Sequence, residues 1–268
     1  MKIALCIKQV PDSWAEKKMG ADQRLDRASV DAVLNDLDEY AIESALTLVE
    51  ANSPTGEAGE GSGHTITVIS MGPERATEAL RKALSMGADD AILVNDDALA
   101  GSDALATSKV LAAVIAEGGY DLVLCGTEST DARMSVIPAM LAERLGFAQL
   151  TFAGKVSVEG SNVKISRQTE FGVEEMSASL PVVVSVVEKI NEPRYPSFKG
   201  IMASKKKPLV TKSLSDLGIS ASDVGSSAAW SSVKDSLPRP PRGAGIKVVD
   251  DGNAGTQLVA FLSERKLA

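Results

Sequence analysis

Short apolar runs alternate with amphipathic helical patterns along the first half of the chain, and this alternation constrains the fold more than any other feature. The apolar runs at 2–8, 65–70 and 121–125 predict strands, and the longest helical pattern spans 35–50. Strands that alternate with helices build parallel sheets, because each helix carries the chain back to the edge where the previous strand began. We therefore expect an α/β fold in which helices cover both faces of a parallel sheet, with right-handed crossovers.

Residues that favour helix ends stand where these patterns begin and stop. Asn35 and Asp103 are suitable N-caps, because a side-chain oxygen there can accept a hydrogen bond from a first-turn amide. Pro73 and Pro138 suit first turns, and Gly87 suits a helix end. The local signals agree with the alternation, so the expected sheet is Rossmann-like.

The second half of the chain has a different pattern. The segments 155–158 and 163–167 predict a β-hairpin, and 173–180 continues its alternation of apolar and polar residues. The nearly continuous apolar run at 181–187 predicts a buried strand. Clear periodicity ends near residue 191, so we expect an added antiparallel section followed by an extended C-terminal arm.

Composition excludes several classes of function. The formal net charge of −8 argues against nucleic acid as a partner, because phosphates attract a basic surface. One histidine and two cysteines, Cys6 and Cys125, cannot supply a usual zinc site, a catalytic triad or a disulfide framework. No apolar run is long enough to cross a bilayer, so we expect a cytoplasmic protein that does not insert into a membrane.

The loop at 126–135 is the best candidate for a ligand site. It leaves the carboxyl end of an expected strand and enters an expected helix, which is the edge where open parallel sheets bind ligands. Its hydroxyls and the amides at a helix N-terminus can hold a phosphate. Cys6, Met71 and the turn at Asn35 belong to the same edge. The residues alone leave two interpretations open, an adenine nucleotide site and a capped polar loop without a ligand.

Several familiar nucleotide motifs are absent from the sequence. There is no Walker A lysine motif, and no GxGxxG follows the first strand, so an NTPase and an NAD-linked dehydrogenase both lack support. The glycine-rich run at 56–63 precedes a strand, whereas a phosphate-binding loop joins a strand to a helix. We therefore interpret this run as a linker.

The segment 187–202 carries the most specific signal. Its sequence is Val-Glu-Lys-Ile-Asn-Glu-Pro-Arg-Tyr-Pro-Ser-Phe-Lys-Gly-Ile-Met, and lysines follow at 205–207. It resembles the β subunit of electron transfer flavoproteins, in which an Asn-Glu-Pro-Arg-aromatic opening leads to an apolar residue, Ile-Met and a lysine cluster. The resemblance covers nearly the whole chain in order, through 7–12, 82–89, the loop at 126–135 and 244–248.

The resemblance implies an electron carrier without catalytic turnover, which works as a heterodimer with a larger α subunit. FAD would be held mainly by the α subunit, and this chain would form one wall of the flavin site. Electrons would come from flavin dehydrogenases and pass to the respiratory chain through a quinone oxidoreductase. This chain would also bind AMP structurally, through Cys6, Asn35, Asp36, Leu37, Asp38, Met71, Gly126, Thr127, Ser129, Thr130, Asp131, Ala132, Ser135, Val136 and Ile137.

The resemblance also implies a partner-recognition loop at 191–202, with Phe198 as an apolar anchor where the family usually has leucine. Flanking prolines restrict the segment and lower the cost of ordering it, and an apolar side chain in a partner's pocket is a typical hot spot. We expect a nucleotide-binding core at 1–208 and an arm at 209–268 that packs on the partner subunit. The recognition residues are Asn191, Glu192, Pro193, Arg194, Tyr195, Pro196, Phe198, Ile201 and Met202.

Two positions depart from the family pattern, and two other functions remain open. Ser135–Pro138 replaces a turn that is rich in Gly and Gln in many relatives, and Gln168 stands where relatives often have a glutamate near the flavin. An amide cannot titrate, so Gln168 supplies no charge there. The alternatives are a bifurcating-type flavoprotein subunit with FAD in place of AMP, and a stand-alone sensor of adenine nucleotides.

Overall fold

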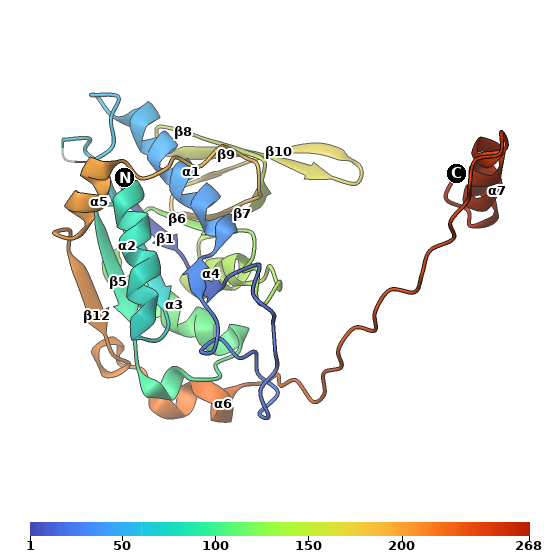
Figure 1. The fold of residues 1–268 in the computed structure, drawn as a ribbon. Coiled ribbons are helices and arrows are strands. Elements are labelled where there is room, and N and C mark those ends of the chain that lie inside the picture. The colour runs from blue at the N-terminus through green and yellow to red at the C-terminus, as the bar shows by residue number, and fades with distance from the viewer. Residues whose placement is uncertain (60) are drawn as a thin grey trace. The chain divides into compact units, whose positions relative to one another are not determined.

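The computed structural model describes residues 1–59 and 61–268, and Figure 1 shows the course of the chain. Glu60, in the glycine-rich run interpreted as a linker, lies outside the described residues. The chain divides into two units, Met1–Lys234 and Asp235–Ala268, and each is described by itself.

The first unit is built on a seven-stranded sheet with the order β12-β5-β4-β1-β6-β11-β7. Every hydrogen-bonded pair of neighbours in this sheet is parallel, as the alternation in the sequence predicts. Its strands are β1 (Lys2–Cys6), β4 (Thr65–Met71), β5 (Asp90–Val94), β6 (Leu122–Gly126), β7 (Ala148–Ala153), β11 (Val182–Val186) and β12 (Leu209–Lys212).

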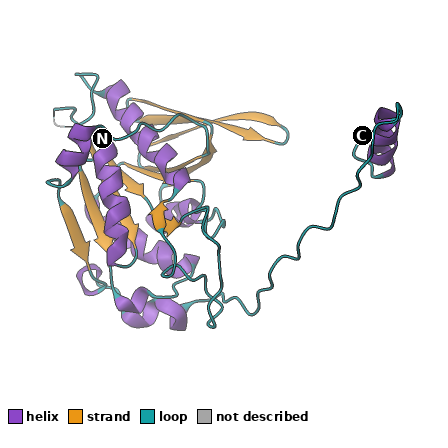
Figure 2. Ribbon diagram, viewed as in Figure 1, coloured by secondary structure: helices purple, strands orange, loops and turns teal. Residues whose placement is uncertain are grey.

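Helices cover both faces of this sheet (Figure 2). The apolar side chains of α1 (Asp36–Asn52) and α2 (Thr77–Met86) join one buried cluster. Those of α3 (Ala104–Gly118) and α4 (Ile137–Leu145) join a second cluster. Alternate residues of β1 divide between the two, with Leu5 in the first and Ala4 in the second, because neighbouring side chains of a strand point to opposite faces. The predicted α/β fold is confirmed.

The predicted helix ends at Gly87, Asp103 and Pro138 are present, whereas Pro73 precedes a short 3-10 helix (Glu74–Ala76) and does not lie in the first turn of α2. The Asp103 side chain accepts a hydrogen bond from the backbone N–H of Ala106 at 3.0 Å and caps α3. Gly119 follows α3 with a φ of 62°, which glycine adopts at little cost. Pro138 lies in the first turn of α4, where a missing backbone N–H breaks no helical hydrogen bond.

The second half adds antiparallel structure, and the predicted hairpin is confirmed. A three-stranded sheet has the order β10-β9-β8, and the β9–β10 hairpin extends away from the parallel sheet (Figure 1). The buried side chains of Val163 and Ile165 join the core cluster of α1 and α2. The strands are β8 (Lys155–Glu159), β9 (Asn162–Thr169) and β10 (Gly172–Ser179), and a separate pair is formed by β2 (Gln9–Pro11) and β3 (Ala32–Leu34).

Short elements complete the two units. The first unit also contains α5 (Phe198–Ser204) and α6 (Gly225–Ala228). Its edge strand β12 lies after residue 208, within the segment 209–268 that we expect to form the arm. The second unit contains α7 (Ala254–Glu264), whose apolar residues include Leu258, Phe261 and Leu262. No helix among the described residues is long and apolar enough to cross a membrane.

Replacement of Gly126 by alanine is expected to destabilise the first unit, because α1 lies very close to the end of β6. A Cβ at Gly126 would lie 2.6 Å from Oδ1 of Asp38 and 2.8 Å from the carbonyl oxygen of Leu37. We expect the free energy of unfolding to fall by about 1–3 kcal/mol, measured by urea denaturation.

Gly154→Ala is the matched control, because the nearest atom to its added Cβ is the carbonyl oxygen of Ser166 at 3.5 Å. We expect it to change the free energy of unfolding by less than about 0.5 kcal/mol. An equal effect of the two substitutions would show that the close approach at Gly126 does not limit packing.

Candidate functional site

The order of strands reverses between β1 and β6, so the carboxyl ends of these two strands form the topological switch point of the sheet. From β1 the chain proceeds through α1 to β4 and through α2 to β5 on one side, and it then crosses through α3 to β6 on the other. Cys6 and Cys125 pair in register near the two strand ends, and both are buried. Open α/β sheets bind ligands at such a switch point, so the predicted edge is the candidate site.

Asn35 joins the two loops that leave these strands. Its amide nitrogen Nδ2 donates to the carbonyl oxygen of Glu128 at 2.9 Å, and its Oδ1 accepts from the backbone N–H of Thr130 at 3.0 Å. Asn35 precedes the first residue of α1, as predicted, but its side chain makes no capping hydrogen bond. The loop after β6 takes both polar groups of the side chain, so Asn35 orders the candidate site instead of capping the helix.

Asp38 also directs its carboxylate into the protein. The backbone N–H of Lys8 donates to Oδ2 of Asp38 at 2.8 Å. Burial raises the pKa of Asp38 to about 7, although hydrogen bonds from Asn35, Lys8 and Gly126 oppose this rise. These hydrogen bonds fix the start of α1 against β6 and against the segment after β1. Asp38 therefore fixes the backbone segments that surround the candidate site.

The centre of the loop after β6 holds a buried carboxylate with two cations. Nζ of Lys8 lies 2.8 Å from Oδ1 of Asp131, and Nε of Arg27 lies 2.7 Å from Oδ2. Burial opposes ionisation of Asp131, but the charges of Lys8 and Arg27 outweigh it and lower its pKa to about 2. Burial lowers the pKa of Lys8, and Asp131 counteracts that change. Two cations at the carboxyl edge of a sheet can bind a phosphate group.

The loop turns at 129–133 and then continues without regular structure into α4. Arg133 and Ser135 have φ values of 50° and 55°, a conformation that residues other than glycine rarely adopt. Oγ of Ser135 donates to Oε2 of Glu128 at 2.8 Å, and Oγ1 of Thr127 donates to the carbonyl oxygen of Val186 at 2.6 Å. The first amides of α4 have no intrahelical partners, so this end of the helix can bind an anion.

Hydrogen bonds join only part of the predicted AMP set. Asn35, Asp38 and the loop at 126–131 contact one another through the hydrogen bonds above. Cys6 and Met71 end β1 and β4, and they pack with the core cluster of α3 and α4. Asp36 and Ala132 are exposed, while Leu37, Val136 and Ile137 are half-buried.

Lys8 and Arg27 are not among the residues that the sequence predicts for this site. Lys8 lies in the segment 7–12 that resembles the family, and its place two residues after β1 is a usable signal, because polar residues after a parallel strand face the binding edge. Arg27 lies in the excursion between β2 and β3, which carries no periodic pattern. Its contact with Asp131 spans 104 residues of sequence, so no local signal identifies it.

The segment 191–202 presents a group of exposed apolar side chains, which we call the docking cluster. Tyr195 is 95% exposed, Phe198 is 81% exposed, and Ile201 and Met202 are also exposed. Part of the predicted loop is helical, because α5 begins at Phe198 after Ser197, whose hydroxyl accepts from the backbone N–H of Gly200 at 3.0 Å. Four apolar side chains without cover within one short segment are typical of a surface that binds another protein.

The end of this segment is attached to α2. Nη1 of Arg81 donates to the carbonyl oxygens of Ser204 at 2.6 Å and Lys207 at 2.9 Å. Nζ of Lys207 donates to two carbonyl oxygens at the end of α2, those of Leu84 and Ala88. Lys207 therefore stabilises a helix end, and only the other two members of the lysine cluster are fully exposed.

Comparison with known proteins gives one consistent result. A family profile described as "Electron transfer flavoprotein domain" matches residues 23–217. The chain is 47% identical over 267 residues to the electron transfer flavoprotein subunit beta of Mycobacterium tuberculosis. The aligned residues cover 99% of this chain and 98% of the relative.

Two more distant relatives extend this comparison. The beta subunit of Megasphaera elsdenii is 34% identical over 260 residues, which cover 94% of this chain and 93% of the relative. A subunit of the caffeyl-CoA reductase–Etf complex of Acetobacterium woodii is 34% identical over 270 residues, with both chains covered to 100%.

Asp131→Asn is expected to lower stability in a way that depends on pH. The pKa of about 2 lies below the ordinary value of 3.8, so the carboxylate stabilises the fold above that value and loses its contribution as the pH falls towards 2. With allowance for solvent screening, we expect a loss of about 1–2 kcal/mol at neutral pH. Urea denaturation between pH 2 and 7 measures it, and the variant should show the flatter profile.

Asp22→Asn is the control for this substitution, because its ion pair with Arg24 is long, at 3.7 Å, and exposed. We expect a change of less than about 0.5 kcal/mol. Parallel pH profiles for the wild type and Asp131→Asn would contradict the proposed ion pairs at the loop.

Proposed function

The chain belongs to the electron transfer flavoprotein β-subunit family, and we propose that it accepts electrons from flavin dehydrogenases and passes them to a quinone oxidoreductase. It performs this transfer as a heterodimer with the larger α subunit, without catalytic turnover of its own. The observation that carries the proposal is the 47% identity to beta subunits over 99% of this chain. The segment that bears the docking cluster lies inside this match.

The cofactors of the proposed carrier are FAD and AMP. FAD carries the electrons and is held mainly by the α subunit, while this chain supplies one wall of its site. AMP binds structurally at the edge between β1 and β6. Two observations fit this ligand: Lys8 and Arg27 bring positive charge to the loop, and the start of α4 points its amides at the same edge. Asp131 pairs with both cations. Binding of AMP would therefore require Lys8 and Arg27 to share their contacts between Asp131 and the phosphate.

Gln168 stands at the position of a glutamate that relatives often carry near the flavin, but it cannot supply the negative charge of that glutamate. Its Nε2 donates to the carbonyl oxygens of Thr169 at 3.1 Å and Gly172 at 3.4 Å, at the tip of the β9–β10 hairpin. A neutral amide occupied by these two carbonyl groups supplies no charge to a flavin. We propose that this chain contributes to the flavin site by its shape and by backbone groups.

The C-terminal arm is proposed to pack on the α subunit. α7 has 11 residues, and its apolar side chains Leu258 and Val259 are exposed within the second unit. A helix of this length is marginal in water by itself, so its stability requires a surface that covers the apolar face. The α subunit of the heterodimer supplies that surface.

Co-expression with an α subunit tests the proposed function. The purified complex is denatured, and its released nucleotides are identified and counted by chromatography. A stable heterodimer with one FAD and one AMP is expected. Two FADs without AMP would place the chain with bifurcating flavoproteins, and a stable monomer without an α partner would support the sensor interpretation instead.

Phe198→Ala is expected to weaken the docking of dehydrogenases without altering the flavin. Loss of an exposed apolar anchor should raise the KM of a flavin dehydrogenase for the heterodimer by about tenfold, the equivalent of about 1.4 kcal/mol. Steady-state kinetics with the heterodimer as the varied acceptor measures this change. Phe171→Ala, at a side chain that is 99% exposed on the hairpin, is the control and should leave KM unchanged.

A further inference from the structure

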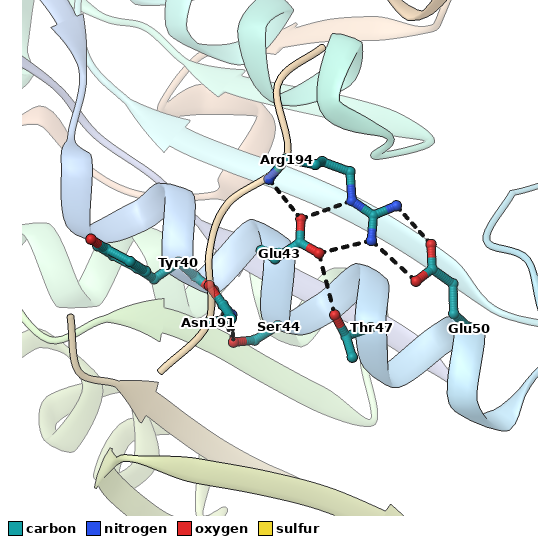
Figure 3. A network of polar contacts seen from close by, with 7 residues as sticks. All are labelled: Tyr40, Glu43, Ser44, Thr47, Glu50, Asn191 and Arg194. Atoms are coloured by element: carbon teal, nitrogen blue, oxygen red, sulfur yellow. Dashed lines mark hydrogen bonds and ion pairs between the residues drawn. The ribbon is translucent and has the colours of Figure 1, made fainter. Parts of the chain in front are cut away.

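The guanidinium group of Arg194 links the segment in front of the docking cluster to two carboxylates of α1, as Figure 3 shows. Nε and Nη2 of Arg194 each donate to one oxygen of Glu43 at 2.8 Å. Nη1 and Nη2 also donate to the two oxygens of Glu50, at 2.7 Å and 3.1 Å. Arg194 therefore binds two carboxylates in the bidentate manner at the same time, and we call these three residues the Arg194 network.

The sequence of α1 accounts for this geometry. Glu43, Thr47 and Glu50 follow one another at helical spacings of four and three residues, so they lie along one face of α1. Oγ1 of Thr47 donates to Oε1 of Glu43 at 3.4 Å and helps to orient it. A planar guanidinium matches two carboxylates on such a face, whereas a lysine ammonium offers no planar fork.

Charge and burial make Arg194 necessary for this face of α1. The side chain of Glu43 is only 10% exposed. Burial opposes ionisation of Glu43, but hydrogen bonds from Arg194 outweigh it and hold the pKa below its usual range. The hydrogen bonds that Arg194 donates to both carboxylates raise its own pKa. Without the guanidinium, α1 would carry two neighbouring carboxylates, one of them nearly buried, with no cation between them.

Two further contacts fix the same stretch of backbone. The backbone N–H of Arg194 donates to Oε2 of Glu43 at 3.1 Å. Nδ2 of Asn191 donates to the carbonyl oxygen of Tyr40 at 3.0 Å and to Oγ of Ser44 at 2.9 Å (Figure 3). The segment is thus bound to α1 at two positions, three residues apart, directly before the docking cluster begins.

The far side of the docking cluster is bound to α2. A Cβ at Gly200 would lie 2.4 Å from the carbonyl oxygen of Ser85, so α5 lies directly against the end of α2. Arg81 holds the end of α5 through the carbonyl oxygen of Ser204. Tyr195 and Phe198 lie between the two attachments and remain exposed, because polar groups on either side make the contacts that hold the segment.

We propose that Arg194 is the positioning residue of the docking cluster: by attaching the segment 191–194 to α1, it sets 195–202 in the orientation that a flavin dehydrogenase binds. This inference rests on the proposed function, because it assigns a role within that docking event. A segment that is ordered before binding loses less conformational entropy when the partner binds. Loss of the Arg194 network should therefore weaken docking without removing any contact with the dehydrogenase, and the transfer step after docking should not change.

The test uses the heterodimer with its bound cofactors and the flavin dehydrogenase that reduces the wild-type heterodimer. Arg194→Lys retains the charge and removes the fork. We expect it to raise KM by about tenfold and to leave kcat within about twofold of the wild type. Hydrogen exchange of the backbone amides of 191–202, measured without the dehydrogenase, should become faster, while α1 itself remains protected.

Two further variants support this test. Glu50→Gln keeps the shape of the side chain, removes one charge and should raise KM by a smaller factor, so it serves if Arg194→Lys fails to assemble. Arg144→Lys is the matched control, because Nε of Arg144 donates to Ser108 and its Nη2 to Leu105, away from the docking cluster. We expect the control to leave KM and the exchange of 191–202 unchanged.

The outcomes separate this inference from the function on which it rests. If Phe198→Ala raises KM but Arg194→Lys leaves KM unchanged, the positioning role is wrong and the docking proposal stands. A raised KM in Arg194→Lys with unchanged hydrogen exchange would also overturn the inference, because Arg194 would then contact the dehydrogenase itself. If neither substitution changes KM, the docking proposal fails as well.

Discussion

The close approach of α1 to the end of β6 is the constraint on which both candidate sites depend. It is possible because Gly126 has no Cβ, and it is fixed by the hydrogen bond between Lys8 and Asp38. At its start α1 thereby defines the edge where the proposed nucleotide binds. Further along the same helix, Glu43 and Glu50 hold the segment that carries the docking cluster. One helix, seated against the sheet at one place, therefore positions two surfaces with different roles.

The polar and apolar groups of the chain have separate tasks. The charged side chains that are partly or fully buried hold loops in place, as Asp131 does for the loop after β6 and Arg194 does for the docking segment. The apolar side chains that a partner can contact take no part in these attachments and remain exposed. This arrangement suits a carrier subunit, because the cofactor supplies the redox chemistry and the protein has to supply orientation and a rigid docking surface.

The sequence predicts the parallel sheet, its covering helices and the hairpin well, because periodicity, caps and turn residues are local signals. It does not predict α5, a seven-residue helix between prolines and a lysine cluster with no periodic pattern. It also gives no sign that Arg194 binds α1, because the ion pair with Glu43 spans 151 residues. Asn35 illustrates the same limit: its place before the helix is predictable, but its side chain serves a loop 93 residues away.

Photo-crosslinking from position 198 tests the central claim most directly. The heterodimer is prepared with p-benzoylphenylalanine in place of Phe198, mixed with the flavin dehydrogenase and irradiated, and crosslinked peptides are identified by mass spectrometry. A second heterodimer carries the same group at Phe171, which is also exposed, on the hairpin. The account predicts a crosslink to the dehydrogenase from position 198 and none from position 171. A crosslink from position 171 alone would contradict it, because the docking surface would then lie on the hairpin and not on the segment held by α1.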